Sequence, residues 1–153
     1  MPLRLTILNG PNLGLLGMRE PEIYGTTSLH DVGESCRRFA AKIGAELQFL
    51  QTDDEGELVR QIHQARGTAD AVIINPAGPT FHSVAISDAL RTFEGPTIEL
   101  HISNIHARDE MHRHSKISGS VTGVICGLGV GGYVVAMQAA AAMLSGRGEA
   151  RAG

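Results

Sequence analysis

The sequence is poor in aromatic residues and in cysteine: its 153 residues include no tryptophan, two tyrosines, four phenylalanines and two cysteines. Cys36 and Cys126 lie far apart and form no C-x-x-C pattern. Such a pair predicts two free thiols, which are typical of a reducing compartment. We therefore expect a cytoplasmic protein without a disulfide.

Long charged or apolar runs are also missing, which excludes several classes of partner. The net charge is −3 and no basic block is present, which argues against binding to nucleic acid. No apolar run approaches the roughly 18 residues of a membrane helix. The N-terminal apolar stretch is short and contains Arg4, unlike a signal peptide. We expect neither a nucleic-acid nor a membrane partner.

Five short apolar stretches alternate with helical patterns along the chain. The predicted strands cover 3–8, 46–51, 70–75, 96–102 and 120–127, and the predicted helices cover 27–44, 53–67, 82–93, 105–115 and 132–146. This alternation predicts an α/β fold with a five-stranded parallel sheet between two helical layers. We expect a single domain over residues 1–146 and a disordered tail over 147–153.

The carboxyl ends of three predicted strands carry Asn9, Asn75 and His101. Ligands of open parallel sheets bind beyond these ends, so the three side chains are expected to converge. Each residue alone is better explained as a turn asparagine or a hydrogen-bonded histidine. Their occurrence at three strand ends favours a site.

Two glycine-rich segments resemble nucleotide-binding loops. The stretch NGPNLGLLG, from Asn9 to Gly17, matches neither G-x-x-x-x-G-K-[ST] nor G-x-G-x-x-G and contains no lysine. The stretch GLGVGG, from Gly127 to Gly132, matches G-x-G-x-x-G but is followed by no further strand. We expect its glycines to allow close packing of a strand against a helix.

The sequence favours acid–base chemistry without a metal. His101, His106, His112 and His114 are close in sequence, but they form no H-E-x-x-H motif and no cysteine joins them. A polar helix with solvated histidines explains them better. Glu99 precedes His101 by two residues, so both side chains project from the same face of a strand. A carboxylate in this position orients the imidazole and stabilises its charged form.

A glycine-bounded segment after the first strand carries Arg19 and Tyr24 and is expected to act as a lid. Ionising a free tyrosine near neutral pH costs about 4 kcal/mol. A neighbouring arginine lowers that cost, because it stabilises the phenolate. Taken alone, these two residues are better explained as exposed loop residues.

Taken together, these segments resemble the type II 3-dehydroquinate dehydratases over nearly the whole chain. The likeness rests on ILNGPNLGLLGMREPEIYG, VIINPAG, SVAISDAL, IELHISNIHARDE, RHS and TGVICGLGVGGY in the family's order. The resemblance implies a flavodoxin-like three-layer sandwich, no metal or organic cofactor, and a trimer-based homo-oligomer, as in the family's dodecamers. It also implies a trans-dehydration of a small-molecule substrate through an enolate.

The resemblance implies a role for each matching residue. Tyr24 corresponds to the base, Arg19 to its activating partner, Asn12 to the residue that steadies the enolate through water, His101 to the acid and Glu99 to its orienting partner. The implied substrate-binding residues are Asn75, Ile102, Ser103, the supporting Arg108, and Asp88, which in the family reaches a neighbouring subunit's site.

The sequence departs from the family pattern in two places. The family usually reads N-P-G-A-Y-T-H-T-S where this chain reads NPAGPTFHS, so Phe81 replaces a histidine and His82 follows it. His112 replaces the first arginine of R-R-H-S. In the family, the histidine and the arginine at these two positions hold distal hydroxyls of the substrate. His82 is a candidate replacement for the missing histidine.

Three functions remain open at this point. The first is dehydration of 3-dehydroquinate to 3-dehydroshikimate. The second is the same reaction on a related cyclic hydroxy-ketone acid, which the altered distal residues would suit. The third is binding of a small acid without catalysis, which the presence of both a candidate base and a candidate acid argues against.

Overall fold

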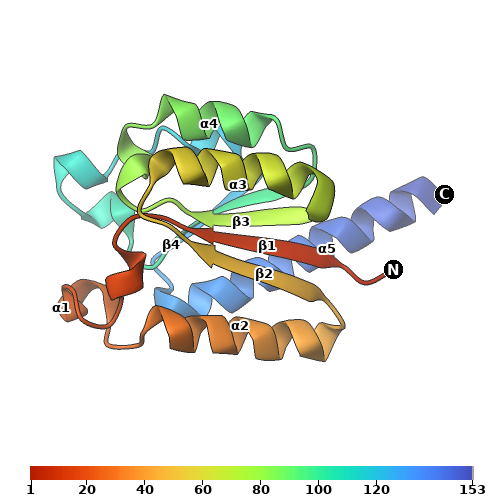
Figure 1. Cartoon of the computed structure of the whole chain (residues 1–153), viewed down its shortest axis with the longest axis horizontal. Helices are drawn as coiled ribbons and strands as arrows, with labels where there is room; N and C mark the ends of the chain where they lie inside the picture. Colours follow the sequence, from red (N-terminus) through yellow and green to blue (C-terminus); the bar gives the residue numbers. More distant parts are fainter. Residues whose placement is uncertain (153) are drawn as a thin grey trace.

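The computed structural model describes the backbone of residues 1–152 and the side chains of residues 1–148. A parallel sheet in the order β2-β1-β3-β4-β5 forms its middle layer (Figure 1). The strands are β1 (Arg4–Asn9), β2 (Glu46–Gln51), β3 (Ala71–Asn75), β4 (Thr97–His101) and β5 (Gly123–Cys126). This is the strand order of flavodoxin, with its switch point between β1 and β3. The predicted parallel sheet is confirmed.

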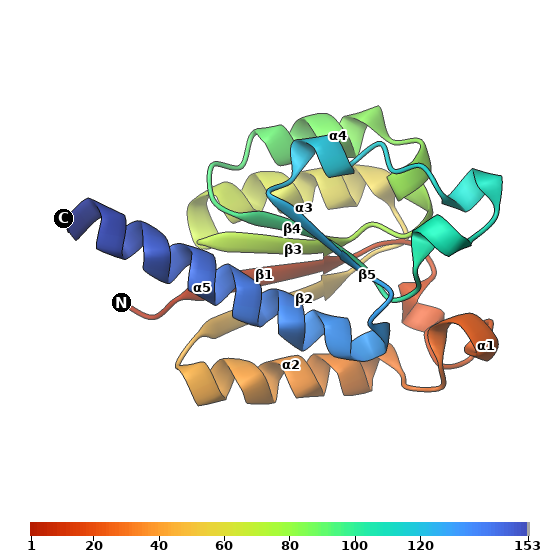
Figure 2. The same ribbon diagram turned by 180° about the vertical axis from the view of Figure 1, so that it is seen from behind.

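Helices cover both faces of the sheet. The α-helices are α1 (Pro21–Tyr24), α2 (Leu29–Ile43), α3 (Glu55–Thr68), α4 (Val84–Arg91) and α5 (Gly132–Ala152). Helices α2 and α5 pack on one face, and α3 and α4 pack on the other (Figure 2). Each face has its own buried apolar cluster. These layers form the predicted three-layer sandwich.

Helices α2, α3 and α4 each begin after a polar N-cap residue. Ser28 accepts a hydrogen bond from the Asp31 N–H at the start of α2, as a preferred N-cap residue does. Gly44 follows that helix with φ 69°, a conformation that glycine adopts at little cost. The predicted limits of this helix are therefore confirmed.

The segment 105–115, which was predicted to form one polar helix, instead forms two single turns. They are 3₁₀ turns at Ile105–Ala107 and Glu110–His112. The Asp109 side chain accepts the His112 N–H and caps the second turn. A capping residue has extended backbone geometry, so it interrupts the helix in the middle of the segment.

The last helix also differs from the prediction. Helix α5 continues to Ala152, so the backbone of residues 147–152 is helical rather than a disordered tail. The sequence predicts that this helix ends at Gly146, but the helix continues through Gly146 and Gly148. A glycine in an exposed helix costs about 1 kcal/mol, and the alanine, arginine and glutamate between and after them are good helix formers.

Within the described residues, one helical stretch is long and apolar enough to cross a membrane by length and composition alone. This stretch, Gly129–Gly148, has a mean hydropathy of 1.2, contrary to the expectation from the sequence. It includes Tyr133, Ala136, Met137 and Ala140, which are fully buried against the sheet. A helix that covers a core has the same composition.

The glycines of GLGVGG shape the connection from β5 to α5. Gly127 and Gly129 have φ values of 84° and 67°. A Cβ atom on Gly132 would lie 3.1 Å from Leu100 Cδ1. The segment therefore serves a tight turn and close helix packing, as predicted.

Candidate active site

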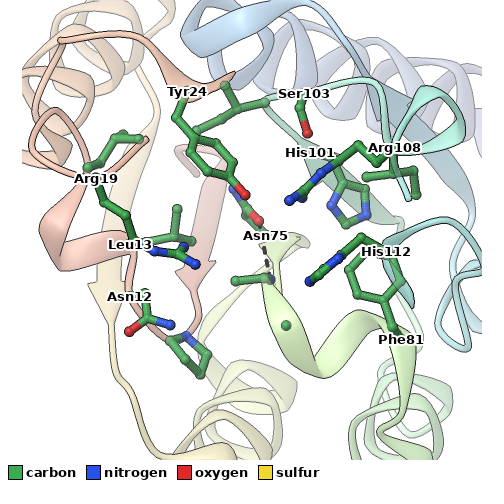
Figure 3. A pocket seen from close by; sticks show the side chains of 16 residues that line it. Asn12, Leu13, Arg19, Tyr24, Asn75, Phe81, His101, Ser103, Arg108 and His112 are labelled. Carbon is green, nitrogen blue, oxygen red and sulfur yellow. Dashed lines mark hydrogen bonds between the residues drawn. The ribbon is translucent and has the colours of Figure 1, made fainter. Parts of the chain in front are cut away.

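A cavity of ≈ 200 Å³ lies at the carboxyl ends of the strands (Figure 3). Its polar lining residues are Asn12, Arg19, Tyr24, Asn75, His101, Ser103, Arg108 and His112. Strands β3 and β4 contribute Asn75 and His101, and the segment after β1 contributes Asn12, Arg19 and Tyr24. The predicted convergence at the strand ends is confirmed for Asn75 and His101. Asn9, in contrast, is buried behind the cavity.

Glu99 and His101 form a buried pair beside the cavity. The Glu99 Oε2 and His101 Nε2 atoms lie 2.6 Å apart, and the two residues are 0% and 5% exposed. Because Nε2 is bound to the carboxylate, Nδ1 is the ring nitrogen left for a ligand. The pairing predicted from strand alternation is confirmed.

Two serines hold the other oxygen of Glu99. Ser118 Oγ donates to Oε1 at 2.7 Å, and Ser115 Oγ donates at 3.1 Å. Burial raises the pKa of the Glu99 carboxyl, but the hydrogen bonds from His101, Ser118 and Ser115 outweigh it and leave the pKa below its usual value. The carboxyl is therefore ionised at neutral pH. An ionised carboxylate can orient the His101 ring and stabilise its protonated form.

Positive charge surrounds Tyr24, whose hydroxyl points into the cavity (Figure 3). The Arg108 Cζ atom lies 5.7 Å from the centre of the Tyr24 ring. Arg19 lines the same cavity, and its guanidinium also lies 3.4 Å from the Glu20 carboxylate. Tyr24 therefore shares the cavity with two guanidinium groups.

The glycine-rich loop after β1 forms a compact turn that holds Asn12. A Cβ on Gly10 would lie 2.3 Å from the Pro76 oxygen, so the loop approaches β3 where only glycine fits. Asn12 has φ 70°, and its N–H donates to Asp53 Oδ1 at 2.8 Å. Asp53 and Gln51, which also hydrogen-bond each other, were not predicted to support the site.

An aromatic wall formed by Phe81, His101 and His112 closes one side of the cavity. The Phe81 ring stacks on His101 with centres 6.4 Å apart, and it meets His112 edge-on at 5.4 Å. The His112 Nδ1 atom lies 2.8 Å from Asp109 Oδ1. At most one N–H of His112 is thus available to a ligand.

The remaining predicted site residues take different positions. Ile102 and Ser103 follow β4 and line the cavity. His82 lines a neighbouring hollow with Asp53, Glu55 and Met111 rather than the cavity itself. Asp88 is exposed on α4 and does not line the cavity. Among residues 1–148, no group of three or more histidine, cysteine, aspartate or glutamate side chains is placed to hold a metal ion.

Comparisons with known proteins agree on one family. Residues 3–141 match the family model described as "Dehydroquinase class II". A catabolic 3-dehydroquinase from Emericella nidulans is 54% identical over 134 residues, which are 88% of each chain. A 3-dehydroquinate dehydratase 2 from Agrobacterium fabrum is 54% identical over 133 residues, covering 87% of this chain and 90% of the relative.

The solved structures agree with the sequence comparisons. The crystal structure of a type II dehydroquinase from Propionibacterium acnes superposes with a TM-score of 0.86 and 45% sequence identity. The match covers 90% of this chain and 95% of that one. The family match over residues 3–141 includes both the strands of the sheet and the residues that line the cavity.

Proposed function

The chain belongs to the class II dehydroquinase family, and we propose that it dehydrates 3-dehydroquinate to 3-dehydroshikimate in the cavity between Tyr24 and His101. The enzyme is a hydro-lyase that acts on a small molecule. The observation that supports the site is the buried Glu99–His101 pair, 2.6 Å apart, which faces the same cavity as the Tyr24 hydroxyl. A candidate acid and a candidate base thus flank one ligand-sized space.

The proposed reaction needs one base and one acid. The Tyr24 phenolate removes a proton from the carbon next to the substrate ketone, and the electron pair forms an enolate. The enolate then expels the hydroxyl group on the next carbon. His101 donates a proton to that hydroxyl, which leaves as water. Glu99 stabilises the positive charge that His101 carries before the transfer.

The other polar residues bind the substrate or stabilise charge. Arg19 is the proposed activating partner of Tyr24, Arg108 lies over the Tyr24 ring, and Asn12 steadies the enolate through a water molecule. Asn75, Ile102 and Ser103 bind the carboxylate and hydroxyl groups of the substrate. The backbone N–H groups of Ile102 and Ser103 suit an anionic carboxylate, because a backbone N–H is a hydrogen-bond donor at any pH.

We further propose that the reaction uses no metal or organic cofactor and takes place in the cytoplasm. The described residues offer no cluster of metal ligands, and a carbon acid next to a ketone can be deprotonated by a suitably placed base alone. Cys36 and Cys126 are free thiols, which are typical of proteins in a reducing compartment.

The aromatic wall predicts weak binding of the distal hydroxyls of 3-dehydroquinate. Phe81 offers no hydrogen bond, and a hydroxyl buried without a partner costs about 1–3 kcal/mol. The double variant Phe81→His, His112→Arg adds donors and should raise kcat/KM about 10-fold, mainly by lowering KM. Steady-state turnover of 3-dehydroquinate by the parent tests the proposed reaction, and the double variant tests the wall.

His82→Thr is the matched control for this prediction. His82 lies in the neighbouring hollow, so its replacement should leave kcat/KM within about twofold of the parent value. A large loss in that variant would mean that His82 binds the substrate after all. A double variant no better than its parent would show that the present wall already binds the hydroxyls well.

We propose a trimer-based assembly, a dodecamer, because Asp88 corresponds to a residue that in the family reaches a neighbouring subunit's site. Asp88 is exposed on α4, and Val84, one turn earlier, is 65% exposed. Asp88 therefore reaches a substrate only across a subunit interface. Sedimentation at micromolar concentration should give an oligomer whose subunit number is a multiple of three. A fully active monomer would contradict this.

A further inference from the structure

A chain of hydrogen bonds lies behind the cavity and connects two backbone groups through three side chains. The Ala77 N–H donates to Asn75 Oδ1 at 3.3 Å, and Asn75 Nδ2 donates to the Tyr133 hydroxyl at 3.0 Å. The hydroxyl in turn donates to Asn9 Oδ1 at 2.7 Å, and Asn9 Nδ2 donates to the Leu50 oxygen at 2.9 Å. Only Asn75 of these three side chains lines the cavity.

The two backbone groups at the ends of this hydrogen-bond series determine the direction of every hydrogen bond within it. The Leu50 carbonyl can only accept, so Asn9 must present Nδ2 to it and Oδ1 to Tyr133. The single proton of the Tyr133 hydroxyl is then used on Asn9, and its oxygen is left to accept from Asn75 Nδ2. At the other end the Ala77 N–H can only donate, which requires Asn75 Oδ1 on its side.

The orientation of a side-chain amide is otherwise easily reversed, because its oxygen and nitrogen have the same shape. Here both ends require the same orientation of Asn75. One N–H of Nδ2 is bound to Tyr133, so the second is the donor that remains for a ligand in the cavity. A substrate carboxylate or hydroxyl oxygen is a suitable acceptor.

We propose that Tyr133 is a positioning residue, which fixes the Asn75 amide so that it presents an N–H donor to the substrate. This inference rests on the proposed function, in which Asn75 binds the substrate. Tyr133 itself is 0% exposed and touches no ligand. It acts through Asn75, from a helix that starts more than fifty residues later in the chain.

The two tyrosines of the protein have different tasks. Tyr24 is proposed to remove a proton, whereas Tyr133 has to keep its own. Burial raises the pKa of the Tyr133 phenol well above its usual value, and the hydrogen bond from Asn75 offsets only part of that effect. Its hydroxyl therefore keeps, at neutral pH, the proton that it donates to Asn9 Oδ1. The orientation of Asn75 is thus not disturbed by ionisation of Tyr133 at neutral pH.

Tyr133→Phe tests this inference, because it removes the hydroxyl and keeps the ring. The Asn75 amide then keeps only the longer hydrogen bond from the Ala77 N–H, at 3.3 Å, and kcat/KM should fall about 10-fold. The loss should be in KM rather than kcat, since Asn75 holds the substrate equally in the ground and transition states. Phe49→Leu is the control for packing, because Phe49 contacts the Tyr133 ring at 6.2 Å between centres and has no polar group. It should leave KM unchanged.

A double-mutant cycle separates positioning from a structural role. In an Asn75→Ala background, Tyr133→Phe should change kcat/KM by less than about twofold, because its target is absent. If the two substitutions instead reduce kcat/KM by independent factors, Tyr133 does not act through Asn75 and the inference is wrong.

Nuclear magnetic resonance tests the hydrogen bonds in the parent protein, whether or not it turns over 3-dehydroquinate. The Asn75 side-chain amide protons should show cross-peaks to the Tyr133 ring. If those protons instead lie near the Ala77 amide, the orientation is reversed and the inference fails. An inactive parent with the expected cross-peaks would refute the proposed function and leave the orientation of Asn75 established.

Discussion

Replacement of Tyr24 by phenylalanine should abolish dehydration while ligand binding remains measurable. The substitution removes the only group in the cavity that we assign as the base, and loss of a general base costs about 10²–10⁴-fold in rate. The ring remains in place below Arg108, so the cavity keeps its shape. Turnover of 3-dehydroquinate and titration with a substrate analogue measure the two effects separately.

Tyr133→Phe is a matched control, since the chain has two tyrosines. That variant should raise KM, whereas Tyr24→Phe should lower kcat. Exchange of substrate hydrogen with deuterated water gives a direct measure of the base. Tyr24→Phe should stop the exchange next to the ketone. A Tyr24→Phe enzyme within threefold of the parent rate would refute the assignment.

Replacement of His101 by alanine should stop elimination by removing the proposed acid, at a similar cost of about 10²–10⁴-fold. Tyr24 remains in this variant and should still remove the proton next to the ketone. We therefore expect hydrogen exchange into the substrate without formation of the dehydrated product. Mass spectrometry of recovered substrate, in parallel with a product assay, measures both.

His114→Ala is the control for this second prediction. The side chain of His114 is 68% exposed and pairs with Glu110 outside the cavity, so its loss should leave turnover unchanged. The turnover of Glu99→Gln should lie between those of His101→Ala and His114→Ala, because this substitution removes the charge that stabilises the protonated His101. Unchanged turnover in His101→Ala would eliminate His101 as the acid.

Much of the fold and the centre of the site follow from local patterns. The alternation of strand residues brings Glu99 and His101 to one face, and the rule for parallel sheets brings Asn75 and His101 to one edge. Helix caps at Ser28 and Gly44 are likewise local. Such features depend on residues a few positions apart or on the order of strands.

The supporting contacts depend on distant parts of the chain and were not predictable. Tyr133 lies 124 residues from Asn9, to which it donates, and no spacing rule connects them. Asp53 holds Asn12 from 41 residues away. His82 is a candidate for the cavity because it follows Phe81, but Phe81 lines both the cavity and the neighbouring hollow, whereas His82 lines only the neighbouring hollow.

The backbone around the cavity has a consequence for attempts to make this enzyme more heat-resistant. Asn12, Glu20 and Ala77 are the residues other than glycine with positive φ in the described chain, and each such conformation costs about 1–3 kcal/mol. Glycine at these positions would relieve strain, but it would remove the Asn12 side chain, loosen the segment that carries Arg19, and loosen the Ala77 N–H that helps to orient Asn75. The exposed glycines of α5 offer a safer choice, because alanine at Gly146 meets no other atom within 4 Å and lies far from the chemistry.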